Sequence, residues 1–251
     1  MEYPLVSILI PVFNGEAYLR NSIESARKQT IQNIEILILN DASTDRTAEI
    51  AQELMLNDSR ISLHSNRQNI GVAKTRNYGF SLSKGKYIAL LDADDIWAPN
   101  KLELQLEQIK KNNLDVCYTG YSFIDANGSP IGKPYSVPEN LTIKRLIAEN
   151  VVGCSTVLLR KELVSQVQMY PEFAHEDYVF WLELMQKGYK FGGVNKQLAL
   201  YRVTKESRSG DKKRAAINRW RIYRDFLKMN PLSAGIAFFS YTVRGFYKHL
   251  K

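Results

Sequence analysis

Short apolar runs alternate with amphipathic stretches along the first half of the chain. The runs are rich in Ile, Leu and Val, which is typical of buried strands, and they lie at residues 6–12, 34–39, 61–64, 87–91 and 116–119. The stretches between them repeat their apolar residues at helical spacing and predict helices at 16–28, 41–55, 71–83 and 101–112, with Gly85 closing the third. This alternation predicts an α/β fold, in which a mainly parallel, doubly wound sheet has helices on both faces.

The second half of the chain has a less regular pattern. Residues 121–160 are mixed, and the composition of residues 125–130 predicts a turn. A helix at 176–187 and a strand at 198–203 follow, and the remainder favours helix.

Charge is unevenly distributed along the 251 residues, whose net charge is +8. Residues 205–251 hold 12 Lys/Arg and 3 Asp/Glu, whereas residues 1–204 hold 22 and 23. A basic tail of this kind indicates an anionic partner, either a membrane or a nucleic acid. Two cysteines provide no disulfide framework and favour a reduced, cytoplasmic setting. We expect neither a signal peptide nor a transmembrane helix, because no uncharged apolar run approaches the ~20 residues that a span requires.

Three carboxylates follow directly after the strand at 87–91, namely Asp92, Asp94 and Asp95. Carboxylates crowded together repel one another and are costly to desolvate, and a cation would offset that cost. Mg²⁺ or Mn²⁺ suits such oxygen ligands and usually binds through one or two carboxylates plus substrate phosphates. The run therefore predicts a metal-bridged diphosphate site. The alternative is a solvated acidic turn in which Asp95 or Asn100 caps the next helix.

Further polar segments accompany this run, and their order and spacing are informative. They are Pro11–Asn14, Asn40–Asp45, Asn69–Gly71 followed by Arg76, and His175–Asp177 followed by Trp181. Together with the acidic run, they resemble the family 2 inverting glycosyltransferases over residues 5–203. The resemblance implies the GT-A fold. The first half contains neither a Walker A loop nor a GxGxxG sequence after a strand.

The resemblance implies which residues bind the nucleotide. Asp41 would accept a hydrogen bond from the imide N–H of uracil, while Pro11 and Phe13 line the base pocket beside Asn14. Arg76 would reach the diphosphate, since a guanidinium fork suits phosphate oxygens. The ordinary alternatives are helix capping for the segment containing Asp41, strand-end packing for Pro11 and Phe13, and a surface ion pair for Arg76.

Within the acidic run, the resemblance makes Asp94 the metal ligand through the diphosphate. Asp92 would contact the ribose or the ion and its waters, Ala93 would border the nucleotide-sugar, and Asp95 would bind the donor sugar or cap a helix. Many relatives place a His shortly after a Tyr-Arg pair, but Thr204 stands there in this chain. A third protein ligand for Mn²⁺ or Mg²⁺ is therefore left open.

The resemblance also implies a general base, which takes the proton of the acceptor hydroxyl. Asp177 matches that position, with Glu176 as its neighbour and fallback. The alternative is an acidic first turn that complements the helix dipole. Trp181 would form an apolar wall against an acceptor sugar or else belong to the core.

These expectations combine into one hypothesis. Residues 1–204 form a catalytic domain, in which 1–120 bind the nucleotide-sugar and 121–204 the acceptor, and residues 205–251 form a membrane-associating helical tail. The enzyme would move a hexose, glucose first and galactose second, from a UDP-sugar to GlcNAc- or GalNAc-diphosphate-undecaprenol in bacterial O-antigen or capsule synthesis.

The hypothesis places the protein peripherally on the cytoplasmic face of the inner membrane, with no nucleic acid as partner. Two alternatives remain. One is a polyprenyl-phosphate sugar transferase, and the other is a non-catalytic membrane or nucleic-acid adaptor on the same fold.

Overall fold

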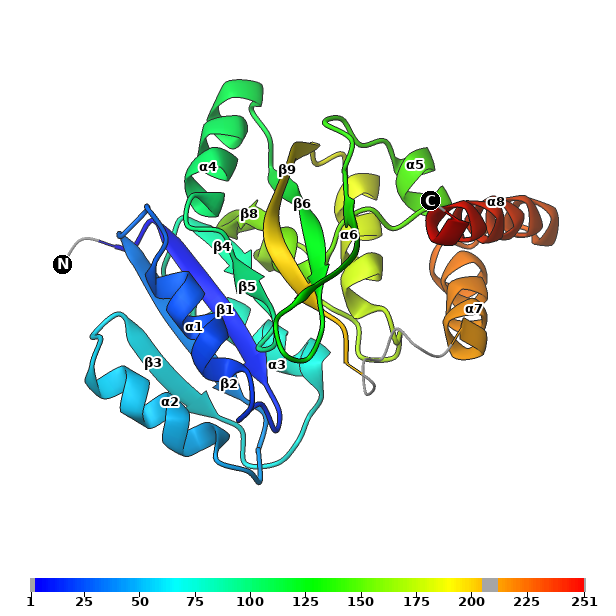
Figure 1. The fold of residues 1–251 in the computed structure, drawn as a ribbon. Coiled ribbons are helices and arrows are strands. Elements are labelled where there is room, and N and C mark those ends of the chain that lie inside the picture. The colour runs from blue at the N-terminus through cyan, green and yellow to red at the C-terminus, as the bar shows by residue number, and fades with distance from the viewer. Residues whose placement is uncertain (1–2, 205–211, 251) are drawn as a thin grey trace.

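A nine-stranded sheet forms the centre of the computed structural model (Figure 1). The structure describes the backbone of residues 3–204 and 212–250 and the side chains of residues 3–204 and 215–243. The first seven residues of the predicted basic tail, 205–211, lie outside the described residues.

The first half of the sheet is parallel, as the sequence predicts. Its strands lie in the order β3 (Ile61–Ser65), β2 (Ile34–Asn40), β1 (Val6–Val12) and β4 (Tyr87–Leu90). Each pair is parallel because a helix carries the chain back between consecutive strands. Val12 lies opposite Asn40, so the carboxyl ends of β1 and β2 are level with each other.

The second half of the sheet is mixed. The sequence predicted a mainly parallel sheet and did not indicate these antiparallel pairs. β8 (Leu158–Arg160) is antiparallel to both β4 and β6 (Val116–Ile124), while β9 (Phe191–Arg202) is parallel to β6. The edge strands β5 (Ile96–Trp97) and β7 (Pro130–Tyr135) run antiparallel to β9 and β6. A tight turn joins β6 to β7, and such a turn can join only antiparallel strands.

Helices cover both faces of the sheet, and the sheet separates the hydrophobic core into two clusters. One cluster contains α1 (Leu19–Arg27), α2 (Thr47–Leu56) and α4 (Lys101–Asn112). The other contains α3 (Val72–Leu82), α5 (Ile143–Ala148) and α6 (Glu176–Gln186). Successive residues of β1 point to opposite faces, so Ile8 and Ile10 join the first cluster and Leu9 the second.

Some helix boundaries differ from those expected. α2 begins only at Thr47, because side-chain hydrogen bonds hold residues 41–45 as a loop instead. α3 ends at Leu82, so Gly85 does not close it. Gly85 instead permits close approach of the chain to β1, since a Cβ there would lie 2.5 Å from the backbone nitrogen of Ser7.

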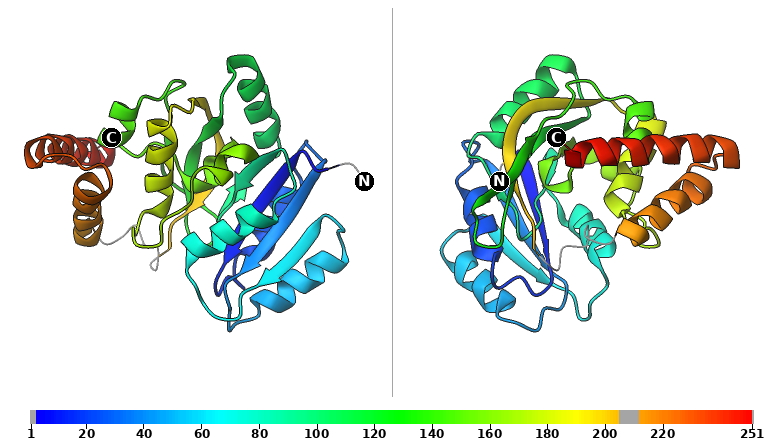
Figure 2. Two further views of the ribbon diagram at one scale, coloured as in Figure 1. Left: turned by 180° about the vertical axis from the view of Figure 1, so that it is seen from behind. Right: turned by 45° about the vertical axis from the view of Figure 1, so that its right-hand side comes forward.

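The tail is helical where it is described, in agreement with the sequence. It comprises α7 (Lys212–Arg221), a π-helical turn at Ile222–Phe226 and α8 (Pro231–Leu250). These helices extend to one side of the sheet, beyond α5 and α6 (Figures 1 and 2). The Tyr223 hydroxyl donates a 2.7 Å hydrogen bond to the carbonyl of Ile147, which attaches the tail to the end of α5.

Candidate active site

The loops after β1, β2 and β4 meet at one edge of the sheet, where the carboxyl ends of parallel strands collect. They surround a cavity of about 560 Å³. Its walls include eight residues that the sequence singled out: Pro11, Phe13, Asn14, Asp41, Arg76, Asp92, Ala93 and Asp94. The structure thus brings together most of the predicted donor site.

Asp41 is a buried carboxylate with a fixed orientation on the cavity wall. Its Oδ1 accepts hydrogen bonds from the side-chain amide of Asn66 at 2.8 Å and from the backbone N–H of Ile70 at 2.9 Å. Its Oδ2 accepts one from the N–H of Gly71 at 2.8 Å. Asp41 therefore holds the loop before α3 and does not cap α2, whose N-cap position is occupied by Arg46.

Asn14 connects the first two loops. Its φ of 51° is a left-handed conformation that Asn tolerates better than most residues. Its side-chain oxygen accepts from the N–H of Thr44 at 2.8 Å, and its own N–H donates to the Ser43 hydroxyl at 2.9 Å. The neighbouring Phe13 lines the cavity with half of its surface exposed. An exposed aromatic ring at a cavity wall can stack on a planar base.

The acidic run divides into two parts. Asp92, Ala93 and Asp94 line the cavity, whereas Asp95 is 1% exposed and absent from its wall. The Asp95 carboxylate instead accepts from the Ser155 hydroxyl at 2.5 Å and from the N–H of Arg202 at 3.0 Å. The structure therefore places Asp95 as an internal anchor, away from the predicted donor sugar. It does not cap α4 either, whose N-cap residue is Asn100.

Arg76 occupies a different environment from the one expected. It borders the cavity, but it is 2% exposed and already bonded to two carboxylates. One Nη donates to Asp92 at 2.6 Å and the other to Glu176 at 2.8 Å. The guanidinium therefore serves two acidic side chains. The alternative of a surface ion pair is wrong, because Arg76 and its partner Glu176 are both buried.

Glu176 and Asp177 form the first turn of α6. Glu176 is buried against Arg76, while Asp177 is partly exposed and accepts the N–H of Tyr178 at 2.8 Å. Burial and the neighbouring Glu176 raise the pKa of Asp177 to about 6, although Arg76 opposes the shift. A carboxylate with such a pKa can accept a proton near neutral pH.

Trp181 belongs to the core, so the prediction that it contacts the acceptor is wrong. Its side chain is fully buried, and its ring centroid lies 5.1 Å from that of Phe180 and 6.3 Å from that of Phe191. α6 is buried on several sides, because Trp181 packs against Phe191 of β9 while Tyr178 contacts Arg219 of the tail.

Several residues of the site were not predicted. Gly15, Tyr18, Val72 and Thr75 join the cavity wall, whereas Tyr201 and Thr204, which also line it, belong to the segment with the Tyr-Arg pair that the sequence singled out. Ser155 and Arg202 contact the acidic run without lining the cavity. Their polarity alone did not predict these contacts, because both residues lie in segments far from the acidic run in the sequence.

The carboxylates on the cavity wall could hold a divalent cation only together with oxygen atoms of a bound ligand. In the described part of the chain, no group of three or more His, Cys, Asp or Glu side chains could hold an ion by itself. Asp92 and Asp94 are nevertheless hard oxygen donors on one cavity wall, which is the protein contribution expected where diphosphate oxygens and waters complete the shell.

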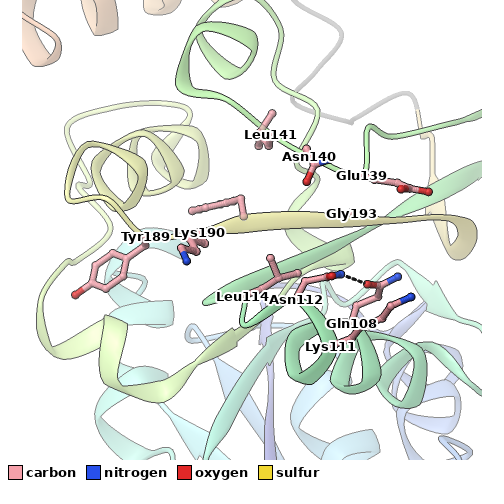
Figure 3. A pocket seen from close by; sticks show the side chains of 11 residues that line it. Gln108, Lys111, Asn112, Leu114, Glu139, Asn140, Leu141, Tyr189, Lys190 and Gly193 are labelled. Atoms are coloured by element: carbon pink, nitrogen blue, oxygen red, sulfur yellow. Dashed lines mark hydrogen bonds between the residues drawn. The ribbon is translucent and has the colours of Figure 1, made fainter.

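A second cavity, of about 650 Å³, lies at the other end of β9 (Figure 3). Gln108, Lys111 and Asn112 at the end of α4 contribute to it, together with Phe191 and Gly193 at the start of β9. Tyr201 at the end of β9 lines the first cavity instead. The larger cavity is thus remote from the clustered carboxylates, and the smaller one is the candidate active site.

Comparison with solved structures agrees with this fold. Staphylococcus aureus TarS residues 1–349, in complex with UDP, superimpose with a TM-score of 0.66 and 22% identity over 88% of this chain and 70% of that one. The mannosyltransferase PcManGT from Pyrobaculum calidifontis, in complex with GDP-Man and Mn²⁺, gives a TM-score of 0.73 at 13% identity, covering 96% of this chain and 69% of its own.

Sequence comparison identifies the family. An Escherichia coli protein named UDP-Glc:alpha-D-GlcNAc-diphosphoundecaprenol beta-1,3-glucosyltransferase WfgD is 36% identical over 251 residues, covering 99% of this chain and 96% of that protein. The model of glycosyl transferase family 2 matches residues 7–165. This chain therefore belongs to glycosyl transferase family 2 and is a glycosyltransferase with the GT-A fold.

Proposed function

We propose that this enzyme transfers a hexose from a UDP-sugar to a lipid-linked acceptor, GlcNAc- or GalNAc-diphosphate-undecaprenol, with inversion at the anomeric carbon. The observation that carries the proposal is the convergence of Asp41, Asp92 and Asp94 around one cavity, with Arg76 on its wall joining Asp92 to Glu176 of α6. Glucose is the first candidate for the donor sugar and galactose the second. The name of the Escherichia coli relative supports glucose and the acceptor class.

Asp41 supports selection of uridine. Three N–H groups already donate to its carboxylate, so the Asp41 side chain is oriented before a nucleotide binds. A fixed carboxylate favours the imide N–H of uracil and disfavours cytosine, whose N3 carries no hydrogen. Phe13 and Pro11 would supply the apolar walls of the base pocket.

Asp94 and Asp92 would hold Mn²⁺ or Mg²⁺ together with the diphosphate of the donor. When bound, the ion neutralises charge that develops on the departing UDP. Arg76 contributes by a different route, because its guanidinium donates hydrogen bonds to Asp92 and Glu176 and holds both side chains in place.

Asp177 would act as the general base. It takes the proton of the acceptor hydroxyl while that oxygen forms a bond to the anomeric carbon, and the bond between this carbon and the phosphate oxygen breaks, so that UDP leaves with the electron pair. The raised pKa of Asp177 matches this task, since the carboxylate is basic enough to bind the proton yet ionised at neutral pH.

The tail would place the enzyme on a membrane surface, where a lipid-linked acceptor is found. Leu232, Ile236 and Phe239 are 76%, 65% and 71% exposed and follow one another at helical spacing on α8. Trp220, 40% exposed on α7, packs its ring against Phe238 of α8. An apolar helix face beside basic residues suits adsorption to anionic lipid.

Over residues 3–204 and 212–250, no helix is both long and apolar enough to cross a bilayer. The setting that we propose is bacterial surface-polysaccharide synthesis, such as O-antigen or capsule, on the cytoplasmic face of the inner membrane.

Calorimetry with free nucleotides tests the donor assignment. We expect UDP to bind in the presence of Mn²⁺ and CDP to bind at least tenfold more weakly. Asp41→Asn should reduce this preference, and Asp94→Ala should remove the contribution of Mn²⁺. Equal affinity of the wild-type protein for UDP and CDP would contradict the uridine assignment. Absence of any nucleotide binding would instead favour an adaptor.

A further inference from the structure

Two residues from distant segments hold the acidic run by hydrogen bonds, and neither of them lines the cavity. Ser155 lies in the short 3₁₀ helix Cys154–Thr156, and Arg202 is the last residue of β9. Their side chains are 4% and 3% exposed, so both are interior residues. Each contacts the buried Asp95 and one further residue of the run.

Ser155 fixes the start of the run. Its Oγ accepts a 3.0 Å hydrogen bond from the backbone N–H of Asp92 and donates one to Oδ2 of Asp95 at 2.5 Å. A backbone N–H can only donate, so the hydroxyl oxygen accepts from Asp92 and its own hydrogen is available for the carboxylate. One hydroxyl therefore connects the backbone at Asp92 to the side chain three residues later.

Arg202 fixes the end of the run. Its backbone N–H donates to Oδ1 of Asp95 at 3.0 Å, and its Nε donates to the carbonyl of Asp94 at 2.8 Å. Its Nη1 donates to the carbonyl of Asp125 at 2.9 Å, and its guanidinium carbon lies 4.5 Å from the ring centre of Tyr18. The side chain thus connects the run to the β6–β7 turn and to the residue before α1.

These contacts leave little freedom to the backbone between Asp92 and Asp95. The backbone is held at the N–H of Asp92 and at the carbonyl of Asp94, and Asp95 is bonded on both carboxylate oxygens. Asp92 and Asp94 meanwhile border the cavity. Residues that orient the ligands of a metal ion contribute to its affinity, and their loss typically costs about 10–100-fold.

We propose that Ser155 and Arg202 are positioning residues. Their hydrogen bonds fix Asp95, so that the neighbouring Asp94 presents its carboxylate to a divalent cation bound with the donor diphosphate. The inference rests on the proposed function, because it assumes that Asp94 takes the cation. It assigns to Asp95 the role of an anchor.

Mn²⁺ binding in the presence of UDP, measured by electron paramagnetic resonance, tests this proposal without reference to turnover. Ser155→Ala removes the acceptor for the N–H of Asp92 and should weaken Mn²⁺ binding by about 10–100-fold. UDP binding without Mn²⁺ should stay within about threefold of the wild-type value, because Asp41 and the base pocket are unchanged. Ser155→Thr, which keeps the hydroxyl, should restore most of the Mn²⁺ affinity.

Ser7→Ala is a matched control. The Ser7 hydroxyl also accepts a backbone N–H, that of Gly85, and donates to a carboxylate, that of Glu35, but it lies at the amino ends of the strands. Ser7→Ala should lower thermal stability as Ser155→Ala does and leave Mn²⁺ affinity unchanged. A purely structural role for Ser155 would make the two variants indistinguishable in Mn²⁺ binding, and that result would overturn the proposal.

Arg202→Lys provides a second test should Ser155→Ala fail to fold. A single ammonium cannot serve the carbonyls of Asp94 and Asp125 in the geometry of a guanidinium fork, so Mn²⁺ affinity should fall at least tenfold. Wild-type Mn²⁺ affinity in this variant would contradict the proposal. Wild-type protein that binds UDP but never Mn²⁺ would overturn the proposed metal site itself, and the two failures are thereby distinguishable.

Discussion

Glu176 accepts a 2.8 Å hydrogen bond from Arg76, a residue that lies 100 positions earlier in the chain. The same guanidinium donates to Asp92 at 2.6 Å, so one buried cation joins α6 to the acidic run. The helix with the candidate base and the loop with the candidate metal ligand therefore share an electrostatic partner. The two halves of the site are coupled through Arg76.

Replacement of Arg76 by Met should destabilise the protein strongly. Glu176 and Asp92 would lose their common partner, and removal of one member of a buried ion pair costs about 3–5 kcal/mol. Chemical denaturation measures the loss. Arg46→Met, which breaks an exposed pair with Glu49, is the control and should cost at most ~1 kcal/mol. A cost for Arg76→Met as small as that of the control would contradict the coupling.

Asp177→Asn should abolish most turnover while leaving UDP binding intact. The amide cannot take the proton of the acceptor hydroxyl, and loss of a general base lowers kcat by about 10²–10⁴-fold. Glu176→Gln should cost less in kcat, because its side-chain oxygen can still accept from Arg76. Near-normal turnover of Asp177→Asn would remove Asp177 as the base and favour a polyprenyl-phosphate acceptor, which is already ionised.

The pH dependence of kcat/KM should show an acidic limb near pH 6. Burial and Glu176 raise the pKa of Asp177 from 3.8 to about 6, and only the ionised form accepts a proton. Activity should therefore fall as the pH drops below about 6, approaching a tenfold loss per pH unit. Initial rates from pH 4.5 to 8 measure the limb. A limb near pH 4 would show that Asp177 is unperturbed or does not act as the base.

Removal of the apolar face of α8 should release the enzyme from membranes. The triple variant Leu232→Ser, Ile236→Ser and Phe239→Ser exposes polar side chains where the native ones are 65–76% exposed, so folding should be little affected. Co-sedimentation with vesicles containing phosphatidylglycerol should fall at least fivefold.

Leu56→Ser serves as the control for this measurement, since Leu56 is 84% exposed on α2, far from the tail. It should sediment with vesicles like the wild-type protein. Unchanged sedimentation of the triple variant would show that this face does not contact lipid.

The strands that position the donor site could be predicted from the sequence, because β1, β2 and β4 are largely apolar runs with polar residues at or shortly after their ends. Parallel pairing then requires the segments around Asn14, Asp41 and Asp92 to meet at one edge. Such convergence follows from strand direction alone and needs no knowledge of side-chain contacts.

The interior of the site could not be predicted in the same way. Asp95 and Asp94 are adjacent and chemically identical, and only the distant Ser155 and Arg202 determine that Asp95 turns inward. Trp181 was ambiguous because α6 is apolar on several faces. The mixed order of β8, β6 and β9 depends on long-range pairing, which has no local periodicity.

UDP release from a panel of UDP-sugars with Mn²⁺, measured with and without a synthetic GlcNAc-diphosphate-lipid acceptor, tests the proposed transfer reaction. We expect release that depends on the acceptor with one donor, UDP-glucose first, and its loss in Asp177→Asn. Release from no donor, despite UDP binding in calorimetry, would contradict the proposed acceptor class.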